Sequence, residues 1–378
     1  MKDVFITRVA KFLPNNPVSV DEMEQYLGFI NGKPSRAKKI VLRNNGIKTR
    51  YYALTPEGTL THNNAQLAAE AVKSLFDNSF TREDIELLAC GTSYPDQIMP
   101  SHAIMVHGYL GGRPMETYSP MGNCCSGMHA LKIGYMSIQS ENTSNAVVVG
   151  SELCSPMLQA KNYEEEAKKI GEMENNPILA FEKDFLRWML SDGAGAFLLE
   201  DKPAKNGLSL KIEWVDGISF ANEVETCMYA ASDKDENGNL VSFKQMEPKA
   251  VAENSVMAMK QDVKLLDLYI SQLAARALSG ICKKRNFDVQ EINYVLPHLS
   301  SEFFRFKIAD ELKKYNLEIP QEKWFTNLTS VGNIGAASVF VMVEEILNSG
   351  KLNKGDKLLL AVPESARFSY SYALLTVC

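Results

Sequence analysis

The order of strands and helices in the first half of the chain recurs in the second half, and this duplication constrains the fold more than any other feature. In the first half, apolar strands are predicted at 86–92, near 116–120, at 146–152 and at 191–200, with a helix after Cys125. In the second half, strands are predicted at 292–298, 357–361 and 368–375, with helices through 303–315 and after 331–338. The segment that begins at Cys125 therefore corresponds to the segment that begins at Asn333.

Strands that alternate with helices, several of them almost entirely apolar, are typical of parallel-rich sheets covered on both faces. We expect two α/β halves, residues 1–205 and 206–378, packed about a pseudo-twofold axis. Functional groups in such folds gather at the carboxyl ends of strands and the starts of the next helices. The duplication therefore predicts that the Cys125 turn, the His298 loop and the Asn333 turn face one another.

Two longer segments break the symmetry. Residues 155–190 look helical, and residues 219–262 carry a hairpin signal at Asp235-Glu-Asn-Gly-Asn239. Insertions between core strands often line or cap a pocket. Decoration of the surface or a contact between subunits is an equally open interpretation.

The overall charge excludes some classes of function. The formal charge is −6 and the pI is near 5.6, which argues against nucleic-acid binding as the main activity. No signal-peptide core and no apolar run of about 20 residues is present, so we expect a cytoplasmic protein without a membrane segment. The seven cysteines and five histidines show no metal-ligand spacing, so we predict no metal and no cofactor.

Cys125 is the candidate nucleophile, because a polar, glycine-bearing turn delivers it to the start of an apolar helix. The N–H groups at a helix start stabilise a thiolate and can also hold an oxyanion. Taken alone, Cys125 is equally well interpreted as a small buried residue. By the same reasoning, His298 could simply close a strand, and Asn333 could be a helix N-cap.

Taken together, these residues give the chain a resemblance to the thiolase superfamily, within it to the β-ketoacyl-acyl carrier protein synthase III branch. Five segments in the family's order carry the resemblance: Asn45-Gly-Ile-Lys-Thr-Arg50, Cys125-Ser-Gly-Met, Ser191-Asp-Gly-Ala-Gly-Ala, Leu296-Pro-His-Leu and Gly332-Asn-Ile-Gly-Ala-Ala-Ser. The resemblance implies a thiolase-like fold of two duplicated α/β halves with mixed, mainly parallel sheets, layered α-β-α-β-α. It also implies a homodimer.

The resemblance further implies the roles of three residues. Cys125 would take an acyl group from a thioester carried by acyl carrier protein or coenzyme A. His298 and Asn333 would donate hydrogen bonds to the carbonyl of the second thioester, which stabilises the carbanion that performs a Claisen condensation. A small residue and a glycine follow Cys125, as in the family's nucleophile motif, so Cys124 is interpreted as a packed neighbour.

The sequence departs from the synthase III pattern in two places. The family's glycine-rich C-terminal loop is replaced by Val362-Pro-Glu-Ser-Ala-Arg367, which puts Ala366 at the usual oxyanion-donor position beside the Cys125 N–H. The tryptophan that stacks on the adenine of coenzyme A is also missing. Basic side chains nearby could instead dock an acidic carrier protein, or could form a solvated charged face: Lys33, Arg36, Lys38, Lys39, Arg43 and Arg50.

Glu152 ends a buried strand, where burial would raise its pKa toward that of a general base. An ion pair or hydrogen bonds to backbone N–H groups would explain it equally well. With the segments that begin at Asn31 and Gly91, this pattern resembles the dialkylresorcinol-forming condensing enzymes of bacterial pigment pathways, which include flexirubin-type pathways.

That resemblance implies joining a β-ketoacyl and an α,β-unsaturated acyl thioester to a cyclohexanedione, which a partner enzyme aromatises. Two alternatives stay open. One is the ordinary synthase III reaction of an acyl-coenzyme A with malonyl-carrier protein. The other is a binding or scaffold subunit in which the altered C-terminal loop has removed the oxyanion hole.

Overall fold

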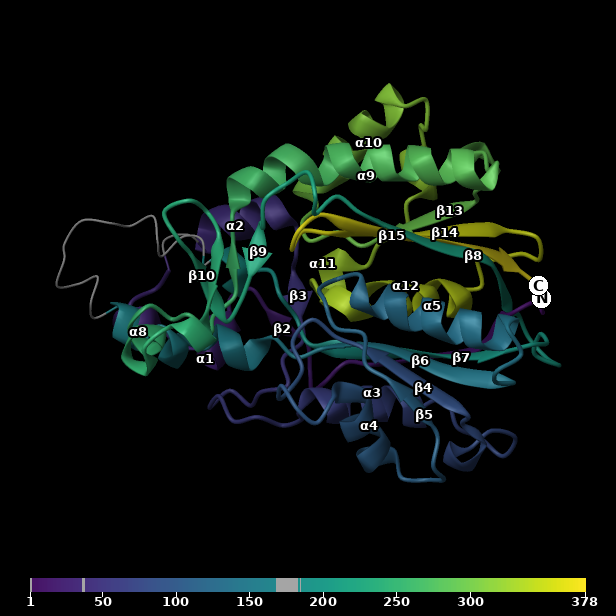
Figure 1. Ribbon diagram of the computed structural model, residues 1–378, viewed down its shortest axis with the longest axis horizontal. Helices are drawn as coiled ribbons and strands as arrows, with labels where there is room; N and C mark the ends of the chain where they lie inside the picture. Colours follow the sequence, from purple (N-terminus) through teal and green to yellow (C-terminus); the bar gives the residue numbers. More distant parts are fainter. Residues whose placement is uncertain (1, 36–37, 168–182, 184) are drawn as a thin grey trace.

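The computed structural model describes residues 2–35, 38–167, 183 and 185–378, and it stacks them in alternating layers of helix and sheet (Figure 1). Within these residues, nine strands form one connected sheet in the order β13-β14-β15-β8-β1-β7-β6-β4-β5. Its two halves meet only through the short β1–β8 pairing of Phe5 with Lys211 and Ile6 with Leu210. The sheet therefore separates into two layers, one from each half of the chain.

The first layer contains β1 (Phe5–Phe12), β7 (Gly193–Glu200), β6 (Asn145–Glu152), β4 (Leu87–Gly91) and β5 (Glu116–Tyr118). The second contains β8 (Leu210–Ser219), β15 (Ser369–Val377), β14 (Lys357–Glu364) and β13 (Tyr294–Pro297). Helices α3 (Asn64–Lys73) and α4 (His102–Leu110) cover one outer face, and α9 (Val263–Arg285) and α10 (Phe303–Lys314) cover the other (Figure 1). Helices α5 (Ser126–Gln139) and α12 (Ser338–Asn348) lie between the two layers.

This arrangement confirms the thiolase-like α/β fold with a mixed sheet between helical layers. One detail of the expectation was wrong: the sheet is not mainly parallel. Parallel pairing joins β4 to β5, β4 to β6 and β13 to β14, whereas β1–β7, β6–β7, β1–β8, β14–β15 and β8–β15 are antiparallel. β7 runs antiparallel to both of its neighbours in the sheet, β6 and β1, and β15 runs antiparallel to both of its neighbours, β14 and β8.

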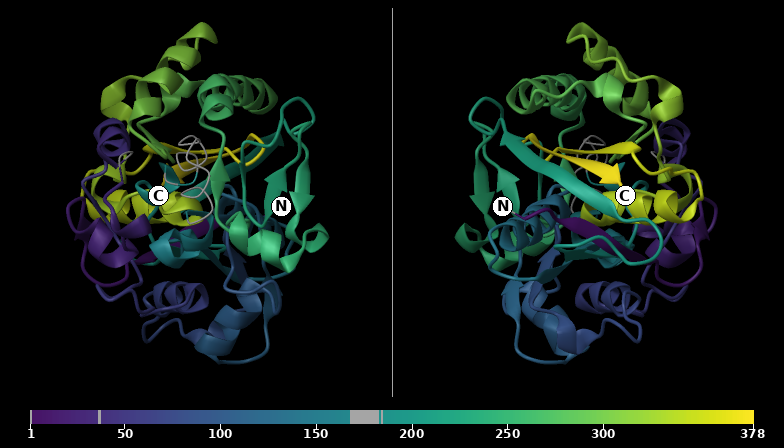
Figure 2. Two further views of the ribbon diagram at one scale, coloured as in Figure 1. Left: turned by 90° about the vertical axis from the view of Figure 1, so that its left-hand side faces the viewer. Right: turned by 90° about the vertical axis from the view of Figure 1, so that its right-hand side faces the viewer.

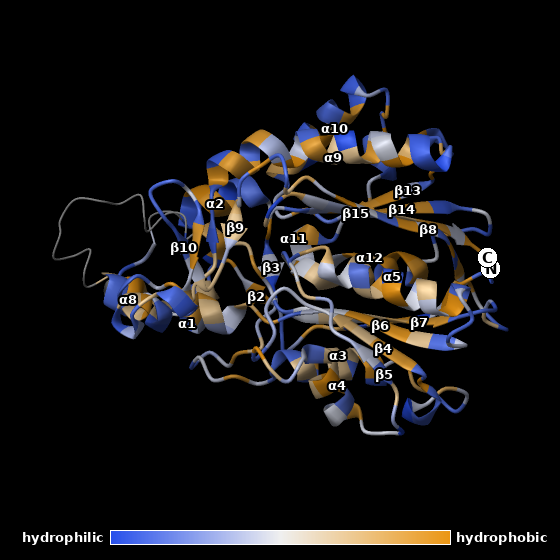
Figure 3. Cartoon of the chain, in the orientation of Figure 1, coloured by the Kyte–Doolittle hydropathy of each residue, from blue (hydrophilic) through white to orange (hydrophobic). Residues whose placement is uncertain are grey.

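The central helices pack very closely where they begin. A Cβ atom at Gly127 in α5 would lie 2.2 Å from the carbonyl oxygen of Ala336, just before α12. Only glycine allows this approach, because any side chain would overlap backbone. α12 buries its apolar side chains between the layers, and the ring of Phe340 stacks on that of Phe197 in β7 at 4.3 Å. The duplicated turns therefore meet at the centre of the molecule, where Figure 3 shows predominantly apolar strands and helices.

The 219–262 insertion stands at one end of the layers, opposite the chain termini (Figures 1 and 2). The expected hairpin at 235–239 is confirmed, because β10 (Ser232–Lys234) pairs antiparallel with β11 (Leu240–Ser242). In the same insertion, β9 (Met228–Tyr229) pairs with β12 (Lys260–Gln261), and α8 spans Pro248–Glu253. Of the helical structure expected within 155–190, residues 164–167, 183 and 185–187 are helical, and residues 168–182 and 184 lie outside the described residues. Residues 155–158 and 160–162 form short 3₁₀ turns.

Smaller elements join the layers to the insertions: α1 (Met23–Leu27), α2 (Lys38–Asn45), α11 (Leu328–Val331), β2 (Val18–Ser19) and β3 (Thr49–Arg50). The proposed division near residue 205 falls between β7 and β8, and it stays a prediction that each half is a domain. In the described part of the chain, no helix has the length and apolarity needed to cross a membrane.

Candidate active site

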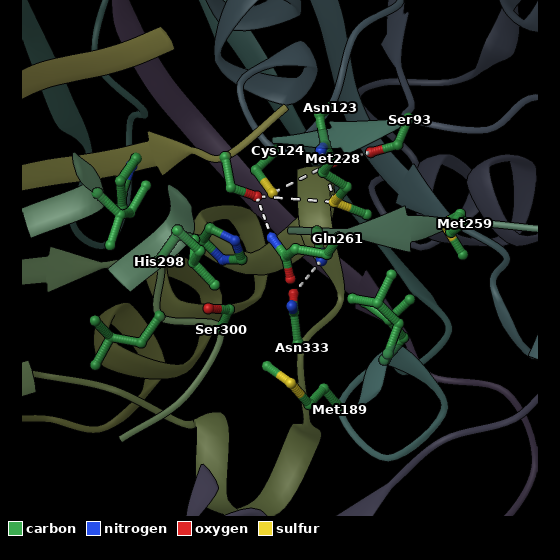
Figure 4. Close-up of a pocket in the computed structure, with 18 of the residues that line it drawn as sticks. Ser93, Asn123, Cys124, Met189, Met228, Met259, Gln261, His298, Ser300 and Asn333 are labelled. Carbon is green, nitrogen blue, oxygen red and sulfur yellow. Dashed lines mark hydrogen bonds between the residues drawn. The ribbon is translucent and has the colours of Figure 1, made fainter. Parts of the chain in front are cut away.

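A narrow cavity lies between the two halves, where β6 and β14 end and α5 and α12 begin. Its volume is about 40 Å³, which is room for very few water molecules. Cys124, Glu152, His298 and Asn333 all line it. Figure 4 shows the Cys124, His298 and Asn333 side chains directed into the same space. The fold therefore brings His298 and Asn333 to one cavity, whereas the thiol in its wall is that of Cys124 and not that of the predicted Cys125.

The thiol in the cavity wall belongs to Cys124. Cys125 is fully buried, and its Sγ lies 3.4 Å from the carbonyl oxygen of Val362 and 3.8 Å from that of Ser369. Cys124 therefore lines the cavity as well as packing beside Cys125, because consecutive residues at a helix start direct their side chains to different sides. The choice of Cys125 as the nucleophile stays a prediction. Burial, then the nearby Glu364 carboxylate, raises the pKa of both thiols well above the ordinary value.

His298 follows β13, and its backbone N–H donates to the carbonyl of Ala361 at 2.8 Å. Burial lowers the pKa of the imidazole to about 4, so the ring is neutral near pH 7. Among the described residues, its Nδ1 has no hydrogen-bond partner. A neutral imidazole has one N–H donor and one acceptor, so this ring can donate a hydrogen bond to a carbonyl in the cavity.

Asn333 is held by its own turn. Its side-chain Oδ1 accepts the N–H of Gly335 at 3.0 Å, and its backbone carbonyl accepts the N–H of Ser191 at 2.9 Å. Because the oxygen of the carboxamide is taken, the NH₂ group is the end that can donate into the cavity. Asn333 is not the N-cap of either following helix, because those N-caps are Ile334 and Ala337, and its role as a hydrogen-bond donor to substrate stays a prediction.

Glu152 ends β6 and is 1% exposed. Its Oε1 accepts hydrogen bonds from Ala336 N at 3.0 Å, from Ser93 N at 3.1 Å and from the Ser93 hydroxyl. Its Oε2 is buried and has no partner among the described residues. Burial raises the pKa of this carboxyl to about 7, against hydrogen bonds that lower it. Such a group can gain and lose a proton near neutral pH.

Gly335 allows the Asn333 turn to wrap around Glu152. Its φ is +46°, and a Cβ atom there would lie 2.7 Å from Glu152 Oε1. Both the left-handed backbone and the close approach require glycine. Sequence reasoning named neither Gly335 nor Ser93 as part of the site. The glycine in the Asn-Ile-Gly motif was the signal that could have pointed to a close approach.

The oxyanion hole differs from the expectation. The Cys125 N–H donates to the Glu364 carboxylate at 3.0 Å, and the Asn123 N–H donates to the same oxygen at 3.2 Å. In this conformation the Cys125 N–H is therefore not free to hold an oxyanion. The Ala366 carbonyl accepts the N–H groups of Cys227 and Met228. The role of the Ala366 N–H as a second donor stays a prediction.

The 219–262 insertion supplies cavity wall, which the sequence left open between lining and decoration. Met228, Met259 and Gln261 all line the cavity. Gln261 donates to the Ser365 hydroxyl at 2.9 Å, so the insertion is tied to the altered C-terminal loop. These residues carry no recognisable motif, and only their position in space reveals them.

Two further apolar spaces adjoin this cavity. One has a volume of about 340 Å³ beside α2 and α10, and shares Met189 and Phe304 with the cavity. The other, of about 30 Å³, lies beneath α9 and α10, and shares Ile308 and Pro363. A substrate that reaches the cavity therefore has apolar space in two directions.

The basic residues near the N-terminus separate into three groups. Lys33, Lys39 and Arg43 are exposed, the last two on α2 beside the larger apolar space. Lys38 is paired with Glu24 at 2.8 Å. Arg50 is fully buried, which corrects its assignment to a docking surface: it lies in β3 within the core, against Met23. Arg36 lies outside the described residues.

The comparisons with known proteins agree with this geometry. Residues 282–365 match the family described as 3-oxoacyl-[acyl-carrier-protein (ACP)] synthase III C terminal. The β-ketoacyl-[acyl-carrier-protein] synthase III of Clostridium perfringens is 24% identical over 369 residues, 95% of each chain. That of Clostridium beijerinckii is 23% identical over 376 residues, 99% of each chain.

Solved structures share the fold along the whole chain. AbyA1, a tetronic acid condensing enzyme, superposes with a TM-score of 0.75 at 21% identity, over 99% of both chains. Xanthomonas campestris OleA, solved with bound lauric acid and lauroyl-CoA, superposes with a TM-score of 0.72 at 19% identity, over 99% of both chains. The sequence relatives and the shared fold together support an acyl-transferring condensing enzyme.

Proposed function

We propose that the protein joins a β-ketoacyl thioester and an α,β-unsaturated acyl thioester into a 2,5-dialkylcyclohexane-1,3-dione, a precursor of dialkylresorcinols. The observation that carries this proposal is the buried Glu152, a carboxyl with a pKa of about 7 in the wall of the condensing cavity. A ring-forming reaction removes protons from carbon at more than one step, which calls for a base inside the site.

In this reaction the acyl group is transferred to Cys125, as the motif at the start of α5 predicts. Cys124 is the alternative acceptor, and its place in the cavity wall supports it. Sulfur attacks the carbonyl of the unsaturated thioester and expels the carrier thiol. His298 and Asn333 donate hydrogen bonds to the carbonyl of the β-ketoacyl partner, which stabilises the enolate that forms when Glu152 removes a proton.

The enolate formed at C4 of the β-ketoacyl unit attacks the enzyme-bound acyl carbonyl and expels the cysteine thiolate, the Claisen step. The carbanion at C2, between the ketone and the thioester, then adds to the β-carbon of the enone and closes the six-membered ring, which places the alkyl groups at positions 2 and 5. Hydrolysis of the remaining thioester and loss of carbon dioxide release the dione. The apolar space of about 340 Å³ that shares Met189 and Phe304 with the cavity supports a substrate that carries an alkyl chain.

The experiment that tests this function is incubation of the purified protein with a β-ketoacyl and a 2-enoyl thioester, followed by mass spectrometry of products and intact protein. We expect a cyclic dione and an acyl adduct on one of the two adjacent cysteines. Only hydrolysis or a linear product would contradict the ring-forming reaction.

A second candidate is the ordinary synthase III reaction, which the names of the curated relatives favour. Stoichiometric release of carbon dioxide from malonyl-carrier protein together with a linear β-ketoacyl product would establish it.

A third candidate, a scaffold without catalysis, is favoured by the burial of Cys125 and by the hydrogen bond from its N–H to Glu364. Failure of both cysteines to form any acyl adduct would support that reading.

The proposed partners follow from the surface. Lys33, Lys39 and Arg43 would steer an acidic carrier protein toward the apolar space beside α2.

We also propose a homodimer through the edge strand β5 and its surroundings. Tyr118 and Met121 are 44% and 67% exposed there, and the β5 edge away from β4 has no partner strand in the described chain. Aromatisation of the dione would require a separate partner enzyme.

A further inference from the structure

Two glutamates occupy equivalent places in the duplicated halves. β6 and β14 are both eight-residue strands, and they end in Glu152 and Glu364, respectively. Glu152 accepts the N–H of Ala336, just before α12, and Glu364 accepts the N–H of Cys125, just before α5, each at 3.0 Å. Each strand therefore ends on a carboxylate that binds the helix start of the opposite half.

We propose that Glu364 plugs the anion site at the start of α5 in the resting enzyme, and that an acyl thioester must displace its carboxylate before the cysteine turn is acylated. This inference rests on the proposed acyl transfer and deepens it, because it assigns a gating step to the same site. It also gives a role to a residue that the synthase III pattern does not contain.

The geometry of the plug is direct. One oxygen of Glu364 accepts both the Cys125 N–H and the Asn123 N–H, at 3.0 and 3.2 Å, and the side chain is only 8% exposed. When a sulfur at this turn attacks a thioester, the new oxyanion needs a donor of this kind. An N–H that is bonded to a buried carboxylate cannot hold the oxyanion at the same time. The carboxylate therefore competes with the transition state for the same donor.

The charges around the two sulfurs oppose their ionisation. Besides each other, the titratable groups that face them among the described residues are Glu364, Glu152, Cys154, Tyr370 and Tyr372. None of these is a cation, and the cavity imidazole of His298 is neutral near pH 7. Glu364 is, after burial, the largest cause of the raised pKa of both thiols. Removing its charge therefore favours the thiolate of either cysteine.

The cavity has a path by which a substrate can move the plug. Pro363 and Ser365, the residues on either side of Glu364, both line the cavity. Ser365 is bonded to Gln261 from the insertion. An acyl group that enters the narrow cavity would contact Pro363 and Ser365 and so displace the segment that carries Glu364. Once the carboxylate leaves, the cysteine sulfur forms a bond to the acyl carbon, the incoming C–S bond breaks, and the cysteine proton passes to the departing thiol.

The test is the rate at which iodoacetamide alkylates Cys124 and Cys125, resolved by peptide mass spectrometry across a pH series. It compares the wild type with Glu364→Ala, Glu364→Gln and the matched surface control Glu322→Ala. We expect Glu364→Ala to alkylate at least about 10-fold faster at one of the two cysteines, with a lower midpoint in its pH–rate profile. Glu364→Gln should lie between, because it removes the charge but keeps an oxygen acceptor. The Glu322→Ala control should match the wild type.

Wild-type rates and midpoints in both Glu364 variants, with native circular dichroism, would overturn the plug. If the alanine variant does not fold, the glutamine variant alone decides between these outcomes. The assay uses no acyl substrate, so it separates the two proposals. Faster alkylation without any condensation product would contradict the proposed function and leave the plug standing. Normal condensation with unchanged alkylation would contradict the plug alone.

Discussion

The two helix-start turns at the centre of the molecule have the same place in the duplicated fold but opposite chemistry. The turn before α5 presents thiols, and the turn before α12 presents the Asn333 carboxamide. Each turn is bound by a glutamate from the other half, but of these two residues only Glu152 lines the cavity, and its Oε2 is fully buried without a partner among the described residues. In both glutamates one oxygen accepts two backbone N–H groups, but Glu152 also accepts the Ser93 hydroxyl. The comparison teaches that duplication supplies matched positions, whereas the surroundings of each carboxyl differ between the halves.

The largest effect on the condensation rate should come from removing a thiol of the turn before α5. Replacing the acylated cysteine by serine should lower the condensation rate at least about 10³-fold, because no thioester forms on the enzyme. Condensation assays of Cys124→Ser and Cys125→Ser measure this, and each serves as the control for the other. Equal, small losses in both variants would show that neither thiol carries the acyl group.

The next effect distinguishes the two glutamates by pH. Glu152 must be deprotonated to act as a base, so the condensation rate should fall as pH drops below about 7. Glu152→Gln should lose about 10²- to 10⁴-fold in rate and should no longer show this limb of the profile. A pH–rate profile of kcat measures both. An unchanged limb in the glutamine variant would assign the ionisation to another group.

Protein stability should report the same ionisation without any substrate. The folded-state pKa of Glu152, about 7, lies above its ordinary value of 4.5, so the folded state binds the proton more tightly. The Glu152 carboxyl therefore contributes fully to the free energy of unfolding below about pH 4.5. This contribution is lost as pH rises through about 7, a change of about 3 kcal/mol. Denaturant unfolding at about pH 5 and about pH 8 should show Glu152→Gln gaining stability relative to wild type by roughly this amount.

A smaller effect should follow from Gly335→Ala, which attacks only the turn that surrounds Glu152. The backbone there has φ +46°, and the new Cβ would lie 2.7 Å from Glu152 Oε1. We expect a loss of about 2 kcal/mol in unfolding free energy, measured by chemical denaturation. Gly350→Ala is the matched control, because it also has a positive φ but meets nothing within 4 Å. Similar losses in the two variants would mean that backbone strain alone accounts for the effect.

The smallest effect should come from the surface, far from either turn. Reversing the charge of Lys39 and Arg43 together should weaken use of an acidic carrier protein several-fold at low salt and have less effect at high salt. Initial rates with carrier-bound and coenzyme A-bound acyl groups, each at two salt concentrations, measure this. Lys202, an exposed lysine just after β7, is the control position. Equal losses for both carriers would argue against a protein-docking surface.

The sequence by itself determined the duplicated α/β fold and the meeting of His298 and Asn333 at one cavity. These follow from periodicity and repeat order, which a chain records locally. It also pointed to Glu152, because a carboxyl at the end of an apolar strand is costly to bury without a purpose.

Only the tertiary structure decided which thiol faces the cavity, that Arg50 is buried, and that Glu364 holds the Cys125 N–H. Which of the two neighbouring thiols faces the cavity depends on side-chain direction. The burial of Arg50 and the contact between Glu364 and Cys125 depend on how separate segments of the chain pack together. A difference of one residue at a helix start turns a side chain by about 100°, which a motif does not specify. Long-range packing sets the environment of each group, and that environment fixes its pKa and its chemistry.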